Sequence, residues 1–257
     1  MAVKEVKDMG ASVLARLKKQ AKETEINYQT CLQLFAQEEF LRKLEMSQYA
    51  ENLVLKGGMF LYTISNFEGR PTMDIAFMLR INLIDHIKNV RIPFSVDIGV
   101  DDVIVPHAVK RTVATRLKGF KEPNIYTYSL ESTMAEKFDA ILKRMTASSR
   151  MKDFYDIFYW SQVFDFDGRV LQEAIFETLQ HRGTVYEKDS MEKIRAFDQN
   201  EFLRNLWTNY YPGSGLDKPD FSSVLKQIDL FIGPPYDAIL SENEFFGIWS
   251  AKENVWK

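Results

Sequence analysis

Residues 73–79 (MDIAFML) and 91–100 (RIPFSVDIGV) carry large apolar side chains at every second position. Successive side chains of a β-strand point to opposite faces, so this period predicts two strands. Asp74 and Asp97 stand on the second face of their strands, each flanked by apolar residues. If the strands are neighbours in one sheet, the two carboxylates converge, and oxygen ligands on rigid strands suit Mg²⁺. The two strands alone favour the ordinary alternative, which is a pair of acids on a water-facing sheet surface.

A glycine pair precedes the first of these strands. The apolar run at residues 53–55 predicts a short strand, residues 56–58 (KGG) follow it, and residues 59–64 predict a helix. Bare N–H groups at such a turn and at a helix N-terminus attract phosphate, although a plain turn is the commoner meaning of two glycines. A phosphate-binding turn followed by an acid on a strand is the minimum equipment for nucleotidyl transfer, which needs a held triphosphate, Mg²⁺ and an aligned hydroxyl.

Most of the remaining chain has helical patterns. Apolar residues at helical spacing predict two helices over residues 10–46 and a further series after Ser129, whose side chain is suited to an N-cap. The later elements are expected as helices at 129–145, from 149, at 170–180, 191–210 and 221–231, short strands at 103–106 and 125–128, and loops at 212–215 and 233–235. We therefore expect an α+β chain of two domains, a mixed α/β domain over residues 1–128 and an all-helical domain over residues 129–257.

Composition limits the functions that this chain can have. With 257 residues and 46% hydrophobic content it can bury a substantial core. A net charge of −3 argues against binding nucleic acid over the whole surface, so such binding needs a local patch. No apolar stretch reaches the roughly 18 residues of a membrane helix, and the N-terminus lacks the apolar centre of a signal peptide. The single cysteine, Cys31, is expected to be buried and reduced, so we expect a cytoplasmic protein.

A second group of charged residues lies in the helical half. At about 100° per residue, Asp153 and Asp156 fall on the side of their helix opposite its apolar residues. The usual meaning of such a pair is the solvated face of an amphipathic helix, and Lys137 is likewise usually a surface lysine. Near them is a basic set that either holds phosphates or is solvated surface, namely Lys143, Arg144, Arg150 and Lys152.

Five motifs occur in an order that points to one family. They are residues 55–58 (LKGG), 70–75 (RPTMDI), 96–99 (VDIG), 128–131 (YSLE) with 135–137 (AEK), and 149–156 (SRMKDFYD). Each motif alone is modest, but five in this order are specific. Together with residues 17–44, they make the chain resemble the AbiEii/AbiGii toxin family of nucleotidyltransferases over residues 10–185.

The resemblance implies a polymerase-β-like nucleotidyltransferase domain with a mixed sheet, followed by an α-helical bundle domain. It implies a toxin of a toxin–antitoxin (abortive infection) system, which transfers a nucleotide from an NTP to an RNA acceptor with Mg²⁺. Some members of the family act on the acceptor end of tRNA, and members are typically paired with an antitoxin protein. A membrane partner is not implied.

The same motifs imply roles for particular residues. The implied nucleotide-binding residues are Lys56, Gly57, Gly58, Thr72 and Lys137. The implied metal ligands are Asp74 and Asp97. The implied catalytic residues are Asp74, Lys137 and Asp153, of which the last two come from the helical half. Supporting roles are implied for Arg70, Glu131, Lys152 and Asp156.

The chain departs from the family pattern at two places. Ala76 stands where the family has the second carboxylate of an Asp-x-Asp pair, on the same strand face as Asp74. Only residues 80–90 separate the two acid strands, where relatives usually have a longer insert. Two hypotheses follow. The motifs around Lys137 and Asp153 favour an active nucleotidyltransferase, whereas Ala76 favours an impaired relative that binds a nucleotide, an RNA or another protein. The motif order disfavours a generic two-domain scaffold.

Overall fold

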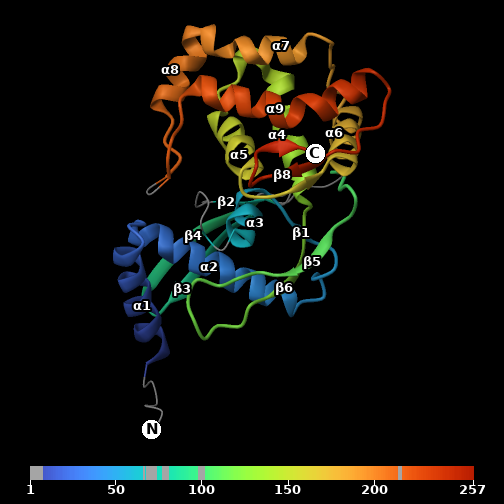
Figure 1. The fold of residues 1–257 in the computed structure, drawn as a ribbon. Helices are drawn as coiled ribbons and strands as arrows, with labels where there is room; N and C mark the ends of the chain where they lie inside the picture. Colours follow the sequence, from blue (N-terminus) through green and yellow to red (C-terminus); the bar gives the residue numbers. More distant parts are fainter. Residues whose placement is uncertain (1–7, 66, 68–73, 77–80, 98–101, 214–215) are drawn as a thin grey trace. The chain divides into compact units, whose positions relative to one another are not determined.

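The computed structural model of the chain describes residues 8–65, 67, 74–76, 81–97, 102–213 and 216–257. The chain divides into two compact units, whose elements are labelled in Figure 1. The first unit comprises Met1–Val100, Val109–Thr127 and Gly213–Leu216. The second comprises Asp101–Ala108, Tyr128–Pro212 and Asp217–Lys257. The chain therefore contributes a short segment to the second unit before it completes the first.

Helices α1 (Met9–Glu23) and α2 (Tyr28–Glu45) open the first unit, as predicted. Each begins after a capping side chain, because the Asp8 and Asn27 side chains accept hydrogen bonds from backbone N–H groups of the first turn at 3.0 and 2.7 Å. Helix α3 (Gly57–Ile64) begins at the glycine pair. The apolar face predicted for α2 is buried, with Cys31, Leu32, Phe35, Leu41 and Leu44 among its core residues.

A three-stranded mixed sheet joins distant parts of the first unit. β1 (Val54–Leu55) pairs in parallel with β6 (Asn124–Thr127), and β6 pairs antiparallel with β5 (Val109–Thr112). β1 and β6 confirm two predicted strands. β5 was not predicted, because four half-buried and exposed residues carry little strand signal until they are placed beside β6.

The two acid-bearing strands are neighbours in a second mixed sheet, as predicted. β2 (Asp74–Ala76) runs parallel to β4 (Val90–Asp97), and β3 (Ile81–Ile87) pairs antiparallel with the other side of β4. No element was predicted for β3, because Ile84 and Asp85 interrupt its alternation. The remaining residues of the two predicted strands, at 73, 77–79 and 98–100, lie outside the described residues.

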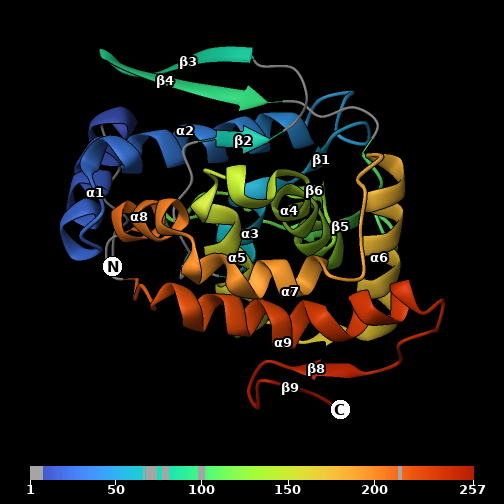
Figure 2. The ribbon, with the colours of Figure 1, turned by 90° about the horizontal axis from the view of Figure 1, so that it is seen from above.

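Strand β4 alternates as its sequence indicates. Ile92, Phe94 and Val96 are buried, and α2 packs against the strand. Arg91 and Pro93, on the opposite face, are exposed. Figure 2 shows the β3–β4 hairpin alongside α2, with β3 as its outer strand.

The second unit is built mainly from helices. Those described are α4 (Leu130–Arg144), α5 (Met151–Ser161), α6 (Gly168–His181), α7 (Ser190–Arg195), α8 (Glu201–Asn209) and α9 (Phe221–Leu240), with 3₁₀ turns at Met145–Ala147 and Ala196–Gln199. α4 packs against α5 and α6, and α9 packs against the same two helices, so their apolar faces share one core. None of the helices in the described ranges combines the length and apolar character that crossing a membrane requires.

Two predictions for these helices are wrong. The helix expected over residues 191–210 is divided into α7, a 3₁₀ turn and α8, because Asn200 adopts an extended conformation and caps α8 with its side chain. The loop expected at residues 233–235 lies inside α9. Pro234 and Pro235 each lack only their own N–H group, and the burial of the surrounding helix outweighs that loss.

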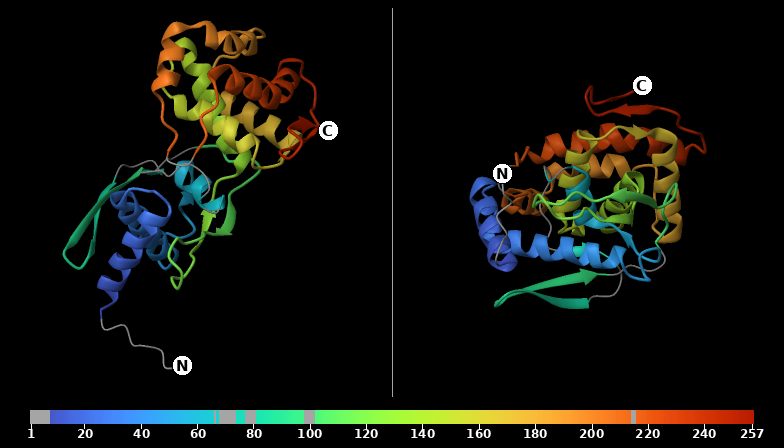
Figure 3. Two further views of the ribbon diagram at one scale, coloured as in Figure 1. Left: turned by 60° about the vertical axis from the view of Figure 1, so that its left-hand side comes forward. Right: turned by 90° about the horizontal axis from the view of Figure 1, so that it is seen from below.

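The expectation of an all-helical second half is also wrong. β7 (Phe166–Asp167), β8 (Ile248–Ser250) and β9 (Val255–Trp256) form a small antiparallel sheet, and β9 packs against α9 (Figure 3). Strands of two or three residues carry too little alternation to be recognised in a sequence. They are held by tertiary packing, since Trp249 is fully buried and its indole N–H donates to the backbone oxygen of Ser161 at 2.6 Å.

The strand expected at residues 103–106 does not form. Helix α4 binds the backbone of this segment instead, because the Val105 N–H donates to Ser132 Oγ at 2.8 Å and the Val105 oxygen accepts from the Ser129 hydroxyl. Ser129 also caps α4 as predicted, accepting from the Ser132 N–H at 3.0 Å. The backbone groups that a strand partner would use are therefore occupied by helix side chains.

Candidate active site

The glycine pair lies at the N-terminus of α3. Lys56 occupies the N-cap in an extended conformation, and Gly57 begins the helix with a φ of 75°. This left-handed conformation strains any residue with a Cβ atom, so position 57 favours glycine. The first N–H groups of a helix have no acceptor within the helix, and Gly58 belongs to this first turn. The turn therefore presents backbone donors of the kind that bind phosphate.

The register of β2 and β4 relates the two strand acids. Asp74 pairs with Ser95, and Ala76 pairs with Asp97. Residues two apart on a strand share a face, so positions 74, 76, 95 and 97 belong to one face of the sheet, with positions 74 and 97 about 8 Å apart as diagonal neighbours. The side chains of Asp74 and Asp97 lie outside what the structure describes, and so do the predicted site residues Arg70 and Thr72.

These backbone positions test whether the residues fit a metal ion. Two carboxylates on adjacent strands are the hard oxygen ligands that Mg²⁺ prefers, so Asp74 and Asp97 fit the ion by their chemistry. Ala76 supplies no oxygen at the position directly beside Asp97. Within the described part of the chain, no three His, Cys, Asp or Glu side chains are grouped so that they could hold a metal.

In the second unit, Lys137 of α4 contacts two acids of α5. Its Nζ is 2.6 Å from Asp156 Oδ2 and 3.6 Å from Asp153 Oδ1. The Nε atom of Arg150, the residue before α5, is 2.6 Å from Asp153 Oδ2. We call these four residues the acid–base cluster. Two cations balance two carboxylates in it, and this pairing offsets the cost of removing the charges from water.

The two acids of the acid–base cluster are buried, which rules out the solvated helix face that is the usual meaning of their spacing. Asp153 and Asp156 are only 2% and 3% exposed, and the side chain of Lys137 is 12% exposed. Helix periodicity could not indicate this, because α4 and α9 both pack against α5 and leave it buried on nearly every side. Acids are almost never fully buried without partners, so the cluster is a strong candidate for a functional site.

The other predicted site residues of the helical unit lie around this cluster in sequence. Glu131 is half-buried in the first turn of α4, where the helix dipole favours an acid. Lys152 is exposed on α5, and Lys143 and Arg144 are exposed at the end of α4. Arg150 is paired with an acid of α5. Of the basic set expected from the sequence, Arg150 is therefore partly exposed and paired with Asp153, and the other three cations are exposed.

A second charged network was not predicted. Arg182, directly after α6, lies 2.8 Å from Glu136 Oε1, 3.0 Å from Asp102 Oδ1 and 3.1 Å from Asp139 Oδ2. The Tyr128 hydroxyl donates to the same Glu136 oxygen at 2.9 Å. These residues are far apart in sequence, and no local pattern connects them.

The electrostatics of this network favour a structural role. Burial lowers the pKa of Arg182, but the surrounding carboxylates outweigh burial and raise that pKa above its ordinary value. Burial, with Glu136, raises the pKa of Tyr128. Both residues therefore remain protonated donors. Their ion pairs and hydrogen bonds hold the segment around Asp102 against α4 and the end of α6.

Comparison with solved structures first defines the class of the fold. The structure of MenT4, a nucleotidyltransferase toxin from Mycobacterium tuberculosis H37Rv, matches this chain with a TM-score of 0.50 and 14% sequence identity, over 91% of this chain and 99% of that chain. At this identity the likeness concerns the fold alone: a mixed α+β architecture similar to that of a nucleotidyltransferase toxin. No curated protein matches the sequence.

The family model for the nucleotidyl transferase AbiEii toxin of type IV toxin–antitoxin systems matches residues 79–242, which is more than half of the chain. The chain therefore belongs to the AbiEii family of nucleotidyltransferase toxins. This confirms the family and the enzyme class that the motifs predicted. The matched region includes Asp97, Lys137 and Asp153, and it begins after Asp74.

Proposed function

We propose that this protein transfers a nucleotide from an NTP to an RNA acceptor in a Mg²⁺-dependent reaction. The observation that carries the proposal is the acid–base cluster, in which Lys137 contacts both Asp153 and Asp156 away from water. A buried lysine between carboxylates is costly to maintain for stability alone, since apolar residues of similar volume often stabilise a protein equally well. Membership of the AbiEii family supports the reaction class and a partner antitoxin.

The first unit supplies the nucleotide and metal ligands in this proposal. The first turn of α3 binds the triphosphate through its backbone N–H groups, as its glycine geometry permits. Asp74 and Asp97 would hold Mg²⁺, and the bound ion would supply positive charge that neutralises the phosphates. The remaining residues assigned to nucleotide contact or support are Lys56, Gly57, Gly58, Arg70 and Thr72.

The helical unit supplies the charged side chains for transfer. Lys137 stabilises negative charge on the phosphates, and Asp156 holds its ammonium group at 2.6 Å. Asp153 accepts the proton of the acceptor hydroxyl while that oxygen bonds to the α-phosphorus, and the bond from the α-phosphorus to pyrophosphate breaks, so that pyrophosphate leaves with the electron pair. Arg150 orients Asp153 through the contact at 2.6 Å. Glu131 and Lys152 support the fold around these groups.

Ala76 favours a second candidate function, nucleotide or RNA binding with little transfer. The register places position 76 directly beside Asp97, and alanine contributes no ligand there. Mg²⁺ accepts water ligands readily, so a site with fewer carboxylates retains binding better than it retains the geometry that transfer requires. The two candidates therefore predict similar nucleotide affinity and different transfer rates.

One experiment separates them. The wild-type chain, Asp153→Ala and Ala76→Asp are each incubated with labelled NTPs, Mg²⁺ and total tRNA, and incorporation into RNA is measured. Transfer by the wild type that disappears in Asp153→Ala supports the enzyme. Transfer that is seen only in Ala76→Asp supports the binding protein. If none of the three transfers any NTP, the proposed reaction is wrong.

We assign the finer organisation on the same basis. We assign the polymerase-β-like nucleotidyltransferase domain to residues 1–128 and the helical bundle domain to residues 129–257, apart from Asp101–Ala108, Tyr128 and Gly213–Leu216, which group with the other compact unit. The acceptor end of tRNA is the RNA that we would test first. Because NTPs and tRNA are cytoplasmic, we place the activity in the cytoplasm. The toxin role is tested by growth arrest when the protein is expressed, and by relief of that arrest when a candidate antitoxin is co-expressed.

A further inference from the structure

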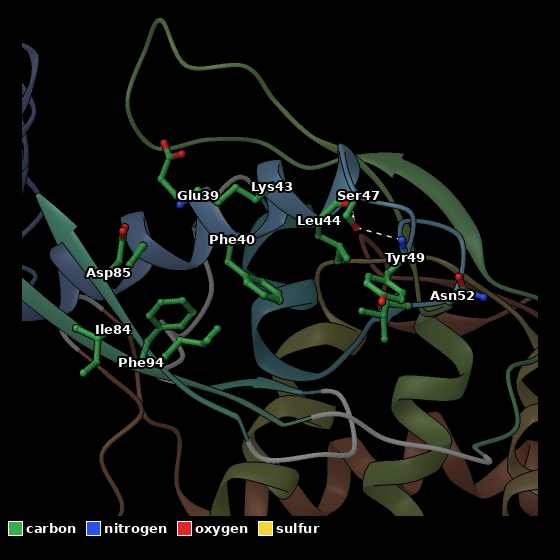
Figure 4. A pocket seen from close by; sticks show the side chains of 13 residues that line it. Glu39, Phe40, Lys43, Leu44, Ser47, Tyr49, Asn52, Ile84, Asp85 and Phe94 are labelled. Atoms are coloured by element: carbon green, nitrogen blue, oxygen red, sulfur yellow. Dashed lines mark hydrogen bonds between the residues drawn. The ribbon is translucent and has the colours of Figure 1, made fainter.

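An apolar groove lies between α2 and the β3–β4 hairpin in the first unit (Figure 4). Its volume is about 640 Å³. Phe40 and Leu44 of α2, Tyr49 and Leu53 of the following segment, and Phe94 of β4 contribute apolar walls. Tyr49 is 57% exposed, so part of this apolar wall faces solvent. None of the residues assigned to nucleotide or metal binding lines this groove.

The groove runs along the edge of β3. Leu83, Ile84 and Asp85 all line it, although consecutive strand residues point to opposite faces. The cavity therefore reaches the backbone of β3 as well as the face that carries Leu83 and Asp85. The sheet order is β2-β4-β3, so β3 has an outer edge on the side away from β4, and no described strand pairs with that edge.

Hydrogen bonding shows which backbone groups face this edge. Asp85 Oδ1 accepts from the His86 N–H at 2.9 Å, so that N–H is directed away from β4. Both backbone groups of a residue in an antiparallel strand point to the same side, and the sides alternate along the strand. Ile84, two residues earlier, therefore also directs its N–H and C=O away from β4, and its side chain is 48% exposed. Within the described structure, neither of these Ile84 groups bonds to the backbone of β4, where Ile84 lies opposite Pro93.

The charged residues that line the groove indicate which kind of peptide segment would bind there. Asp85 is on the same face of β3 as Leu83 and Ile87, and its partner on β4 is the buried Ile92. Lys43 also lines the opposite wall, but neither it nor any other described residue forms an ion pair with Asp85. Glu39 on that wall is already paired with Arg42 at 2.6 Å. An acid beside apolar walls is stabilised by an incoming cation.

We propose that the outer edge of β3 and its groove bind an extended segment of a partner protein that carries a lysine or arginine among apolar residues. The segment adds a strand to β3 by bonding to the backbone of Ile84, and its cation meets Asp85. Its apolar side chains on the same face cover Phe40 and Leu44. A second copy of this chain fits less well, because antiparallel pairing centred on Ile84 would place the two Asp85 residues diagonally across the same face.

The probe is a labelled, end-blocked peptide of sequence Thr-Val-Thr-Val-Thr-Lys-Thr-Val-Thr, in which the valines and the lysine share one face. A second peptide has glutamate in place of lysine, and a third has the lysine peptide's backbone N-methylated along the pairing edge. Binding to the full chain is measured by fluorescence anisotropy. We expect saturable binding of the lysine peptide, about tenfold weaker binding of the glutamate peptide, and none of the N-methylated peptide.

Two variants with a matched control make the test specific. Asp85→Lys should reverse the preference between the lysine and glutamate peptides. Ile84→Pro removes the N–H that faces the groove and leaves the bonds to β4, since proline is tolerated on edge strands, so it should weaken binding about tenfold. Ile84→Val keeps that N–H and should bind as the wild type does. Circular dichroism and the unfolding temperature confirm that each variant is folded.

Several outcomes would overturn the proposal. Equal affinity for the lysine and glutamate peptides would remove the role of Asp85, and binding of the N-methylated peptide would remove strand addition. Absence of saturable binding would reject the groove as a peptide site. Sedimentation that shows a wild-type dimer converted to a monomer by Ile84→Pro would assign the groove to a second copy instead. None of these measurements depends on nucleotidyl transfer, so failure here leaves the proposed function untouched.

Discussion

Replacing Glu38 by glutamine is expected to stabilise the protein at about pH 8 and to change little at about pH 5. Glu38 lies in α2 and is 1% exposed. Its Oε1 accepts from the backbone N–H of Arg116 at 3.1 Å, but its Oε2 is 4.0 Å from the nearest atom of Arg42. Burial raises the pKa of Glu38 from 4.5 to about 7, and the contacts with Arg116 and Arg42 offset burial only in part.

The magnitude follows from this rise in pKa. The folded protein holds the Glu38 proton more tightly than the unfolded chain does, so its contribution to stability is fully present below pH 4.5 and is lost as the pH rises through about 7. A rise from 4.5 to about 7 corresponds to about 3 kcal/mol of unfolding free energy. Glutamine is neutral at every pH and keeps the oxygen that accepts from Arg116. The difference between variant and wild type should therefore grow from below about 1 kcal/mol at about pH 5 to about 3 kcal/mol at about pH 8.

Urea unfolding of wild type and Glu38→Gln at several values between about pH 5 and about pH 8 measures this difference, and other titrating groups cancel in the subtraction. Glu39→Gln is the matched control, because Glu39 lies next in α2 but is partly exposed and paired with Arg42 at 2.6 Å. Glu39→Gln should not be more stable than wild type at about pH 8, because it loses the ion pair with Arg42. If Glu38→Gln is less stable than wild type at the higher pH, the carboxylate is better stabilised in the fold than its burial implies.

The remaining predictions concern the candidate active site. Ala76→Asp should increase transfer to tRNA at saturating Mg²⁺, because it adds a carboxylate directly beside Asp97. Equal, high transfer rates for the wild type and Ala76→Asp would show that position 76 does not bind the metal. NTP with Mg²⁺ should raise the unfolding temperature, and Gly58→Val should abolish that rise by filling the approach to the first turn of α3. If millimolar NTP does not raise the unfolding temperature of the wild type, that result would count heavily against nucleotide binding. Lys137→Met should lower the unfolding free energy by about 3–5 kcal/mol in urea titrations, because the buried Asp153 and Asp156 then lose their contacts with the Lys137 ammonium group. A loss below about 1 kcal/mol would mean that the other contacts of these two acids are enough to stabilise them in the fold.

Much of the fold could be predicted from local patterns. The two acid strands were recognisable because a period of two persists over most of residues 91–100, and their pairing in one sheet is confirmed. The helices α1, α2 and α4 were recognisable because helical spacing coincides with a capping side chain, such as Ser129. Family membership was accessible because five motifs kept their order along the chain.

Other elements were hidden because their cause is not local. β3, β5 and the β7-β8-β9 sheet are too short or too weakly alternating to be recognised, and they form beside partners that the chain supplies elsewhere. At residues 103–106 a strand was predicted and none forms. Serine side chains at the start of α4 instead bond to the backbone N–H and oxygen of Val105. At residues 233–235, two prolines that usually end a helix were retained inside buried α9.

By itself, the sequence determined the helices and strands with strong periodicity, the glycine turn at the start of α3, and the nucleotidyltransferase family. Only the tertiary structure decided which charged side chains are buried. Asp153 and Asp156 have the spacing of a solvated helix face, yet they are buried because α4 brings Lys137 against them and Arg150 completes the charge balance. A side chain's burial depends on which surfaces pack against its element, and that information lies in contacts between residues distant in sequence.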